Sequence, residues 1–374
     1  MTNREEQLCS IALTRIKGVT QTVALHLVKS LGSAQKVFEP EAVKELVTQK
    51  MYDTLSAAIN AGRAEAMERA AMELEFCEKR SIRVLPYHDE EYPYRLREIP
   101  DAPVVLFYKG NADLNAQRII SIVGTRKISE YGKDICRTFL PKLKEIAPDV
   151  LILSGLAYGV DICAHRASLE NDLPTVGILA HGLDRIYPSM HRDTAIKMLN
   201  QGGLLTEYMS QTNPDKGNFV RRNRIVAGMA DATIVIESAN KGGALITANL
   251  AMEYARDVFA FPGRINDEFS TGCNKLIAEQ KAALITSAYD FAKAMNWDIN
   301  REENAVKQPT LFPVLTEDEE KIWNELSGKT EGITANMLCV SLNLPIHRII
   351  STLSTMITNG WVKQLCGGRY KLLV

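Results

Sequence analysis

The 374-residue sequence has no long apolar run, no excess of charge of one sign and no paired cysteines. Its apolar runs fall short of the roughly 18 residues that a membrane-spanning helix needs, and its first residues, MTNREEQ, are polar. The seven cysteines are odd in number, scattered and never in a C-x-x-C pair, which indicates reduced thiols without structural zinc or disulfides. We therefore expect a cytoplasmic protein with no membrane segment.

Charge and composition exclude several classes of protein. Lys plus Arg number 44 and Asp plus Glu number 45, so any nucleic acid must be held by a local basic patch. Hydrophobic residues make up 46% and charged residues 24%, which argues against disorder, collagen-like repeats and coiled coil. A chain of 374 residues favours two or three domains.

Several motifs of cofactor and metal chemistry are also missing. The residues after Gly124 do not continue as G-x-G-x-x-G, which excludes the usual dinucleotide fingerprint, and there is no P-loop. The six histidines show no H-E-x-x-H or comparable ligand spacing, so we assign no metal and no cofactor. No serine or cysteine lies in a G-x-S-x-G elbow that would mark a nucleophile.

The chain begins with a helical stretch, for which we predict a domain over residues 1–80. Apolar residues lie on one helix face at Ala24, Leu27, Val28 and Leu31. The turn Ile16–Thr20 before them contains a glycine, as in helix-hairpin-helix units whose turn amides hold a phosphate. A glycine turn between helices is more often plain punctuation, and both interpretations stay open.

Residues 81–298 alternate short apolar runs with helical segments. The predicted strands are Arg118–Gly124, Asp149–Gly155, Pro174–Gly182, Gly203–Glu207, Asp231–Ser238 and Asp257–Gly263. This order predicts an α/β fold with a doubly wound parallel, extended Rossmann-like sheet. Ala283–Thr286 adds a strand, Ser287–Trp297 adds a closing helix, and residues 82–110 add strands at one edge.

A polar stretch over residues 299–312 predicts a linker before a third domain at 313–374. Thr316–Ser327 and Thr334–Asn343 are expected helices, and the apolar stripe from Ile346 to Ile357 indicates a third. Trp361–Cys366 and Arg369–Leu373 flank a two-glycine turn, as in a hairpin. Three helices followed by a hairpin predict a winged helix-turn-helix.

Polar and glycine-rich residues follow the predicted strands, and we call them together the strand-end rim. They are Gly124-Thr125-Arg126, Ser154-Gly155, His181-Gly182, Glu207, Glu237-Ser238, Gly242-Gly243 and Pro262-Gly263. Ligands of open parallel sheets bind beyond the carboxyl ends of the strands, and helix N-termini there favour anions. One glycine turn would be ordinary, but a whole rim of them predicts an anion-binding site.

A basic run near this rim is the sharpest local feature of the sequence. Lys216-Gly217-Asn218-Phe219-Val220-Arg221-Arg222-Asn223-Arg224 gathers four cations around one aromatic ring without an acid. We expect it to lie partly in a loop and partly at a helix start, with Arg221 and Arg224 on one helix face. Cations for phosphates and a ring for a base are the parts of a single-strand site, whereas a solvated basic turn is the alternative.

Two carboxylate patterns leave alternatives open. Asp161 and His165 are four residues apart on a helix and form either an acid-base pair or a helix-start carboxylate with a hydrogen-bonded histidine. Glu207 and Glu237 at strand ends are either paired catalytic carboxylates or ordinary helix-terminus charges.

Taken together, the motifs resemble one family, the DNA-processing protein DprA, also called Smf. The resemblance spans nearly the whole chain and rests on ordered motifs at similar spacing. They are Ser121–Arg126, Ser154–Asp161 with Ala164-His165, Gly182–Asp184 with Tyr187-Pro188, Phe219 with Arg222–Gly228, Leu245–Ala248, Val258–Gly263 and Gly272–Ile277. Departures from the common pattern are Leu156, Tyr158, His191, Val220, Gly242 and Ala244.

The resemblance implies a non-enzymatic protein that binds single-stranded DNA, protects it and loads the RecA recombinase during natural transformation and recombination. It also implies a homodimer formed through the Rossmann-like domain, a helix-hairpin-helix or SAM-like domain in front and a winged helix behind. The resemblance implies that DNA is bound by Arg126, Lys216, Phe219, Arg222, Asn223 and Arg224, with Gly155 and Gly243 near the rim. The strand-end rim and the basic run add Gly124, Thr125 and Arg221 to the predicted DNA-binding residues. Replacing Lys216 and Arg222 by Glu is expected to abolish binding and leave the fold intact.

Two rival functions remain. One is a nucleotide-processing enzyme that resembles the phosphoribohydrolases, with Glu207 or Glu237 assisting cleavage of an N-glycosidic bond. Its P-G-G-x-G-T-x-x-E signature is missing, because Pro262-Gly263 continues as Arg264-Ile265-Asn266. The other is a transcription regulator that senses a nucleotide through the Rossmann-like domain and binds a specific duplex sequence through the winged helix.

Overall fold

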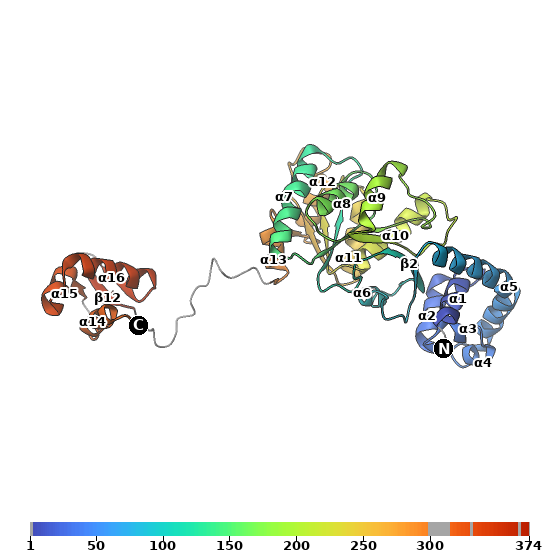
Figure 1. Ribbon diagram of the computed structural model, residues 1–374, viewed down its shortest axis with the longest axis horizontal. Coiled ribbons are helices and arrows are strands. Elements are labelled where there is room, and N and C mark those ends of the chain that lie inside the picture. The colour runs from blue at the N-terminus through green and yellow to red at the C-terminus, as the bar shows by residue number, and fades with distance from the viewer. Residues whose placement is uncertain (1–2, 298–314, 330–331, 366–367, 374) are drawn as a thin grey trace. The chain divides into compact units, whose positions relative to one another are not determined.

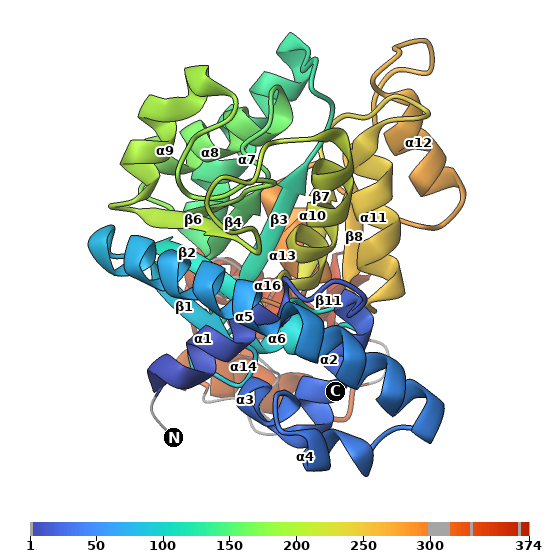
Figure 2. The ribbon, with the colours of Figure 1, turned by 90° about the vertical axis from the view of Figure 1, so that its right-hand side faces the viewer.

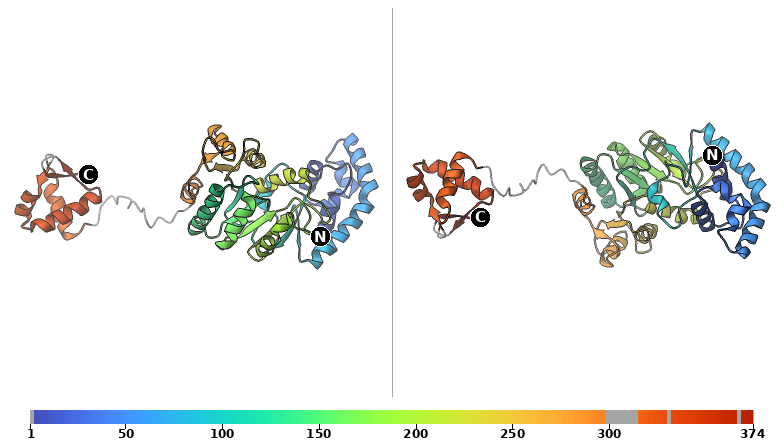
Figure 3. Two further views of the ribbon diagram at one scale, coloured as in Figure 1. Left: turned by 90° about the horizontal axis from the view of Figure 1, so that it is seen from above. Right: turned by 90° about the horizontal axis from the view of Figure 1, so that it is seen from below.

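The structure is a computed structural model that describes residues 3–297, 315–329, 332–365 and 368–373. The chain divides into two compact units, residues 1–300 and 301–374. The first unit holds the N-terminal helices and a large sheet, and the second holds three helices and a small sheet (Figure 1, Figure 3). The N-terminal helices and the large sheet therefore belong to one packed body.

Five helices form the N-terminal part of the first unit. They are α1 (Asn3–Leu13), α2 (Gln21–Leu31), α3 (Ala34–Val37), α4 (Pro40–Lys44) and α5 (Gln49–Lys79). Helix α2 begins after Thr20, whose side-chain oxygen accepts a hydrogen bond from Val23 N, and ends at Gly32 with φ 74°. Its inner face buries Ala24, Leu27 and Val28. Helices α1 and α5 both contact the outermost strand of the sheet, so the helical part abuts one sheet edge (Figure 2).

The sheet has nine strands in the order β1-β2-β6-β5-β4-β3-β7-β8-β9. The strands are β1 (Arg83–Pro86), β2 (Val105–Gly110), β3 (Ile119–Val123), β4 (Leu151–Ser154), β5 (Thr175–Ile178), β6 (Gly202–Thr206), β7 (Ala232–Val235), β8 (Asp257–Ala260) and β9 (Ala283–Leu284). Strands β6 to β9 in this order pair in parallel, whereas β2 is antiparallel to both β6 and β1. The predicted α/β fold with a mainly parallel sheet is confirmed, and residues 82–110 do add strands at one edge.

Both faces of the sheet are covered, because successive strand residues point to opposite sides. Ile119 and Val123 of β3 pack in the same core as Ile225 and Ala248, whereas Ile120 packs on the opposite side. The covering and connecting helices are α6 (Tyr94–Arg97), α7 (Glu130–Ile146), α8 (Val160–Glu170), the 3-10 turn Ser189–His191, α9 (Arg192–Met198), α10 (Lys216–Gly228), α11 (Gly243–Glu253), α12 (Thr271–Ala278) and α13 (Ala288–Ala294).

Most predicted strands end earlier than expected. Strand β5 stops at Ile178 and β7 at Val235, so His181 and Glu237 lie beyond the sheet. The extra residues bend out of the ladder to form the strand-end rim, which is where a ligand of a parallel sheet would bind. Among the described helices, none has the length and apolar character of a membrane span.

The second unit contains α14 (Glu317–Leu326), α15 (Ala335–Leu342) and α16 (Ile346–Thr358), at the positions predicted for three helices. A three-stranded sheet joins β10 (Ile333–Thr334), β12 (Arg369–Leu372) and β11 (Val362–Leu365) in that order. The core of the unit includes Ile322, Leu338 and Leu353. Strand β10 is too short to show a sequence pattern, and part of the predicted two-glycine turn lies outside the described residues.

Candidate nucleic-acid interface

The loops of the strand-end rim hold one another through main-chain contacts. Thr125 N donates to Glu237 O at 2.8 Å, and Val160 N donates to Thr125 O at 3.1 Å. Gly159 has φ 78°, and a Cβ there would lie 2.1 Å from Thr125 O. Gly124 is just as tight, since its Cβ would lie 2.4 Å from the Val160 side chain. These glycines allow the loops after β3 and β4 to touch, so the rim is preorganised.

A cation and two aromatic rings lie together on this rim. The guanidinium carbon of Arg126 is 5.4 Å from the centroid of the Phe219 ring. The Phe219 ring is 5.8 Å from the Tyr187 ring, at an interplanar angle of 53°. Exposed Lys216 lies three residues before Phe219 on α10 and therefore on the same helix face. Three predicted site residues are thus brought to one surface.

Sequence reasoning did not select Tyr187 as a binding residue. Tyr187 is 44% exposed, and its ring lies beside the ring of Phe219. In the sequence, Tyr187 stands out only as an aromatic residue directly before Pro188. The structure places it in the loop after β5. Such a ring could equally have been buried, and only the fold places it beside Phe219.

The basic run is helical throughout, so the prediction that it lies partly in a loop is wrong. Asp215 caps α10 by accepting a hydrogen bond from Asn218 N at 2.9 Å. Lys216 is therefore the first residue of the helix. Helical periodicity then sends the cations to different sides: Arg221 is exposed, whereas Arg222 and Arg224 are buried.

Arg222 is directed into the protein instead of toward solvent. Its side chain donates to Gly155 O at 2.7 Å and to Ile178 O, and its Nε donates to Asn223 Oδ1 at 3.3 Å. Only 3% of the residue is exposed. Burial lowers the pKa of Arg222, while the carboxylate of Asp161 raises it. The expectation that Arg222→Glu leaves the fold intact does not hold for this geometry, since the change puts an acid among carbonyl oxygens.

Gly155 is the counterpart of this buried arginine. A Cβ at Gly155 would lie 2.4 Å from the Arg222 guanidinium, so a side chain there would displace it. Asp161 accepts hydrogen bonds from the amides of Gly155 at 3.1 Å and Ala157 at 3.3 Å. Burial raises the pKa of Asp161, and Arg222 opposes that rise. Gly155 therefore serves the packing of the rim.

Arg224 also has internal partners. Its Nη2 lies 2.5 Å from Glu207 Oε2, and its Nε lies 3.7 Å from Asp101. Gln21 of α2 donates to the same Glu207 oxygen at 3.1 Å. Burial raises the pKa of Glu207, against the lowering effect of Arg224. In this arrangement Arg224 links α10 to β6 and α2, and it is not free to meet a phosphate.

The two rim glutamates do not form a pair. Glu207 follows β6 and Glu237 follows β7, which are four strands apart, or roughly 19 Å at the usual strand spacing. Glu237 instead accepts hydrogen bonds from Ser129 N at 2.9 Å and Ser129 Oγ at 2.5 Å. It thereby fixes the N-cap of α7, which is the structural alternative.

Asp161 and His165 likewise have separate partners. The Nδ1 of His165 lies 2.7 Å from Thr175 Oγ1, and the ring is fully buried. Burial lowers the pKa of His165 to about 3. The geometry favours the structural interpretation of both residues. Gly243, the first residue of α11, has open space around it. In the described ranges no three His, Cys, Asp or Glu side chains cluster as metal ligands.

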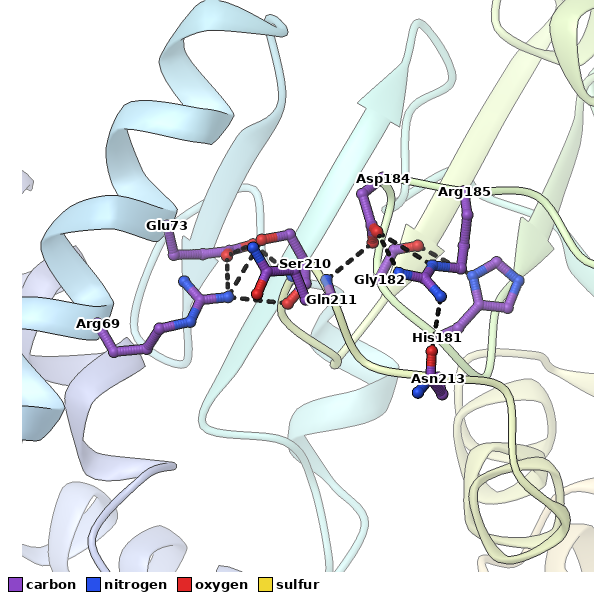
Figure 4. A network of polar contacts seen from close by, with 9 residues as sticks. All are labelled: Arg69, Glu73, His181, Gly182, Asp184, Arg185, Ser210, Gln211 and Asn213. Atoms are coloured by element: carbon purple, nitrogen blue, oxygen red, sulfur yellow. Dashed lines mark hydrogen bonds and ion pairs between the residues drawn. The ribbon is translucent and has the colours of Figure 1, made fainter.

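The loop that leads into α10 is fastened on two sides (Figure 4). Glu73 of α5 accepts hydrogen bonds from Ser210 N at 2.8 Å and Ser210 Oγ at 2.5 Å. On the other side Asp184 accepts from Gln211 N at 3.1 Å. The start of α10 is therefore held by the helical part and by the loop after β5.

Known proteins are similar to this chain in sequence and in fold. The family model described as DNA recombination-mediator protein A matches residues 83–296. DNA processing protein DprA of Streptococcus pneumoniae is 42% identical over 202 residues, which cover 54% of this chain and 70% of that protein. Protein Smf of Escherichia coli is 31% identical over 311 residues, which cover 81% and 82% of the two chains.

Solved structures with TM-scores above 0.5 include those of two DNA processing proteins. The X-ray structure of DprA from Streptococcus pneumoniae has a TM-score of 0.64 and 31% identity, and covers 79% of this chain and 98% of that one. The second, of DNA processing protein A from Helicobacter pylori, is described as giving insight into its single-stranded DNA binding mode. It has a TM-score of 0.52 and 29% identity, and covers 58% of this chain and 97% of that one. The chain belongs to the DNA recombination-mediator protein A family, the DprA or Smf proteins.

Proposed function

We propose that this protein binds single-stranded DNA on the strand-end rim, protects it and loads the RecA recombinase onto it during natural transformation. The observation that carries the binding proposal is the Arg126 guanidinium over the Phe219 ring, with Lys216 on the same side of α10. The single-strand binding described for the related Helicobacter pylori protein supports it. Loading of RecA and a role in transformation rest on family membership.

The geometry suits a strand of any sequence. Phe219 and Tyr187 offer ring faces on which bases stack, and Arg126 and Lys216 meet the phosphates. Every base has a stacking face, so binding of this kind is sequence-tolerant and salt-sensitive. Exposed Arg221 adds a further cation on α10.

We propose that the protein binds DNA without cutting it. The wide separation of Glu207 and Glu237, and the engagement of Glu237 with Ser129, support this over the phosphoribohydrolase alternative. We also propose, from family membership, a homodimer formed through the sheet-containing domain, a helix-hairpin-helix or SAM-like domain at the N-terminus and a winged helix over residues 313–374. The three helices and small sheet of the second unit support the last assignment.

The test is fluorescence anisotropy of the full-length protein with a mixed-sequence single strand and its duplex at several salt concentrations. Replacing both Arg126 and Lys216 by Glu is expected to weaken single-strand binding at least about tenfold. The slope of log affinity against log salt should flatten by about 1.4, since each lost contact to a single strand contributes about 0.7.

The matched control makes the same charge change elsewhere on the surface. Arg137 and Lys142 are exposed cations on α7, and replacing both by Glu is expected to leave affinity nearly unchanged. Equal affinities of the rim variant and the wild type, or a preference for one duplex sequence, would rule out the proposed rim site.

A further inference from the structure

The loop between β4 and α8 exposes one aromatic ring that the proposed strand site does not use. Of residues 155–159, only Tyr158 is exposed, at 41% of its surface. Its neighbour Leu156 is fully buried, and Ala157 is half-buried. A molecule that approaches the tip of this loop from solvent therefore meets the Tyr158 side chain first.

Tyr158 lies in the middle one of three adjacent loops on the strand-end rim. Strands β5, β4 and β3 are neighbours in the sheet and run parallel. Tyr187 follows β5, Tyr158 follows β4 and Arg126 follows β3. At the usual spacing of about 4.8 Å between strands, the three loops begin within about 10 Å of one another. The loop that carries Tyr158 therefore starts between the loops that carry Tyr187 and Arg126.

The backbone next to Tyr158 touches the backbone of Arg126. A Cβ at Gly159 would lie only 2.7 Å from Arg126 Cα, so the two loops are in contact because position 159 is glycine. Consecutive Cα atoms are about 3.8 Å apart, which places Tyr158 Cα at most about 8 Å from Arg126 Cα. Tyr158 and Arg126 are thus neighbours on the rim.

A buried histidine packs against the Tyr158 ring. The His191 ring lies 5.2 Å from the Tyr158 ring, at an interplanar angle of 69°. His191 is 3% exposed, and its Nδ1 donates a hydrogen bond to Leu156 O at 2.9 Å. The histidine is thereby fixed to the backbone two residues before Tyr158. A ring that is already held loses little freedom when a base stacks on it, which favours binding.

One short segment connects this ring pair to Phe219. Tyr187 and His191 are four residues apart in the loop after β5. The Tyr187 ring contacts Phe219 at one end of this segment, and the His191 ring contacts Tyr158 at the other end. Four residues span at most about 14 Å. Phe219 and Tyr158 are therefore close enough for one strand of several nucleotides to reach both.

A single exposed ring is common on protein surfaces and by itself indicates no ligand. Tyr158 differs from such a ring in three respects. It lies beside a cation of the proposed strand site, it packs on a fixed ring, and residues 155–159 contain no acid that would repel a phosphate. These features favour a role in holding the strand.

We propose that Tyr158 is a second stacking position for a base of the bound single strand. One base stacks on Phe219, another base stacks on Tyr158, and Arg126 holds a phosphate between them. This inference rests on the proposed function and extends the strand site across the loop after β4. Because every base has a stacking face, the position is expected to accept all four bases.

The first experiment is anisotropy of full-length variants with a mixed-sequence single strand of about 20 nucleotides, longer than one site of this kind. Tyr158→Leu keeps an apolar side chain against His191 but has no aromatic ring, and should weaken binding at least about fivefold. Tyr158→Phe keeps the ring and should bind like the wild type. The salt dependence should be the same in all three proteins, because no charge is changed. Thermal melting checks that the variants fold.

The matched control removes a tyrosine of similar exposure far from the rim. Tyr94 is 45% exposed on α6, and its amide donates to Asn115 Oδ1 at 2.8 Å. Asn115 precedes β3, so Tyr94 lies toward the end of the strand opposite the rim. Tyr94→Leu should bind the strand like the wild type. Equal affinities of Tyr158→Leu and the wild type would overturn the proposal.

A double variant tests whether Tyr158 contacts the strand itself or only supports Phe219. If each ring stacks its own base, Tyr158→Leu and Phe219→Ala act independently, and their fold-losses in affinity multiply. If Tyr158 only positions Phe219 through residues 187–191, the double variant binds no more weakly than Phe219→Ala. The second result contradicts the proposal.

Photocrosslinking tests the same position in the unaltered protein. A strand that contains 5-iodouracil is bound and irradiated, so that the base forms a bond to an aromatic ring stacked on it, with release of HI. Mass spectrometry of the digested complex then identifies the linked residue. Crosslinks at both Phe219 and Tyr158 are expected. Crosslinks at Phe219 without any at Tyr158 would refute the second stacking position.

The outcomes separate this inference from the proposed function. Failure of the wild type to bind any single strand overturns both. Binding that is lost when Arg126 and Lys216 are replaced by Glu, but is unchanged in Tyr158→Leu, supports the proposed function and overturns this inference alone.

Discussion

Phe219 contributes a ring face that no cation on the rim can replace. Removing it in Phe219→Ala is expected to reduce affinity for a single strand by about 5-fold to 150-fold, because stacking of one base is worth about 1–3 kcal/mol. The salt dependence should stay the same, since no charge is lost. Anisotropy titrations of the full-length protein at several salt concentrations measure both quantities.

The neighbouring residue provides the control for this prediction. Val220 is 46% exposed on the same helix and carries no ring. Val220→Ala should therefore bind the strand like the wild type. A Phe219→Ala protein with wild-type affinity would mean that the bases stack elsewhere.

His165 makes the stability of the fold depend on pH. Its pKa is lowered from 6.5 to about 3 by burial, so the folded protein keeps the ring neutral where the unfolded chain takes up a proton. The contribution is full above pH 6.5 and is lost as the pH falls below it, by about 1.4 kcal/mol per pH unit. Between pH 6.5 and 5 the loss is about 2 kcal/mol.

Urea denaturation of the wild type and of His165→Gln at pH 7.5 and pH 5 measures how much His165 contributes to the change in the free energy of unfolding. The variant is expected to lose less stability between the two pH values than the wild type. Asp161 and Glu207 have pKa values raised by burial and act in the opposite direction, but they are common to both proteins. Identical losses in the two proteins would show that His165 does not carry the effect.

The backbone conformation of Leu156 could not be predicted from the sequence. It is fully buried, and its backbone has φ 53°, a left-handed conformation that costs an L-residue about 1–2 kcal/mol. Glycine would adopt this conformation without that cost. The departure was visible in the sequence, but its meaning required the backbone angle.

At the scale of elements, the sequence predicts the sheet well and the basic helix poorly. The apolar run at Ile119–Val123 is a strand buried on both faces, as expected. By contrast, Arg221, Arg222 and Arg224 are the same type of residue, and only their positions around α10 decide which of them is exposed. Asp215 directly before the run was a helix-start signal that could have corrected the loop prediction.

The loop before α10 depends on α5 for its position. Replacing the buried carboxylate in Glu73→Ala removes the acceptor for both Ser210 donors and the partner of Arg69. We expect a loss of stability of about 3–5 kcal/mol, since a buried pair is broken. We also expect faster amide hydrogen exchange in residues 207–215, measured by mass spectrometry.

A control on the same helix separates this effect from damage to α5. Glu78 is 53% exposed and pairs with Arg4 at the surface, so Glu78→Ala should change stability by less than about 1 kcal/mol. Exchange in residues 207–215 should not change in that variant. Equal exchange of this loop in Glu73→Ala and the wild type would contradict its attachment to α5.

At the scale of the whole molecule, every proposed strand-binding residue belongs to the first of the two compact units. A fragment of residues 1–297 is therefore expected to fold and to bind a single strand with an affinity within about threefold of the full chain, which is less than 1 kcal/mol. Circular dichroism checks the fold of the fragment, and anisotropy checks its affinity. A loss of tenfold or more would assign part of the binding to residues 298–374.

The nearly balanced net charge of the chain is consistent with a local binding surface. The 44 basic and 45 acidic residues cancel over the whole chain, while Arg126 and Lys216 share one rim. Composition could indicate that any basic site must be local, but not where it lies. The rule that parallel strands direct their following loops to one edge predicts the strand-end rim as its location.

Gly155 contacts the Arg222 guanidinium, so these two positions, 67 residues apart in sequence, are expected to depend on each other when either one is mutated. A mutation that adds a methyl group at 155 is harmful while arginine stands at 222, and becomes tolerable once a shorter side chain has replaced it. Random mutagenesis would thus find each single change deleterious and the order of changes decisive. Evolution of this rim must pass through position 222 before position 155 is free to vary.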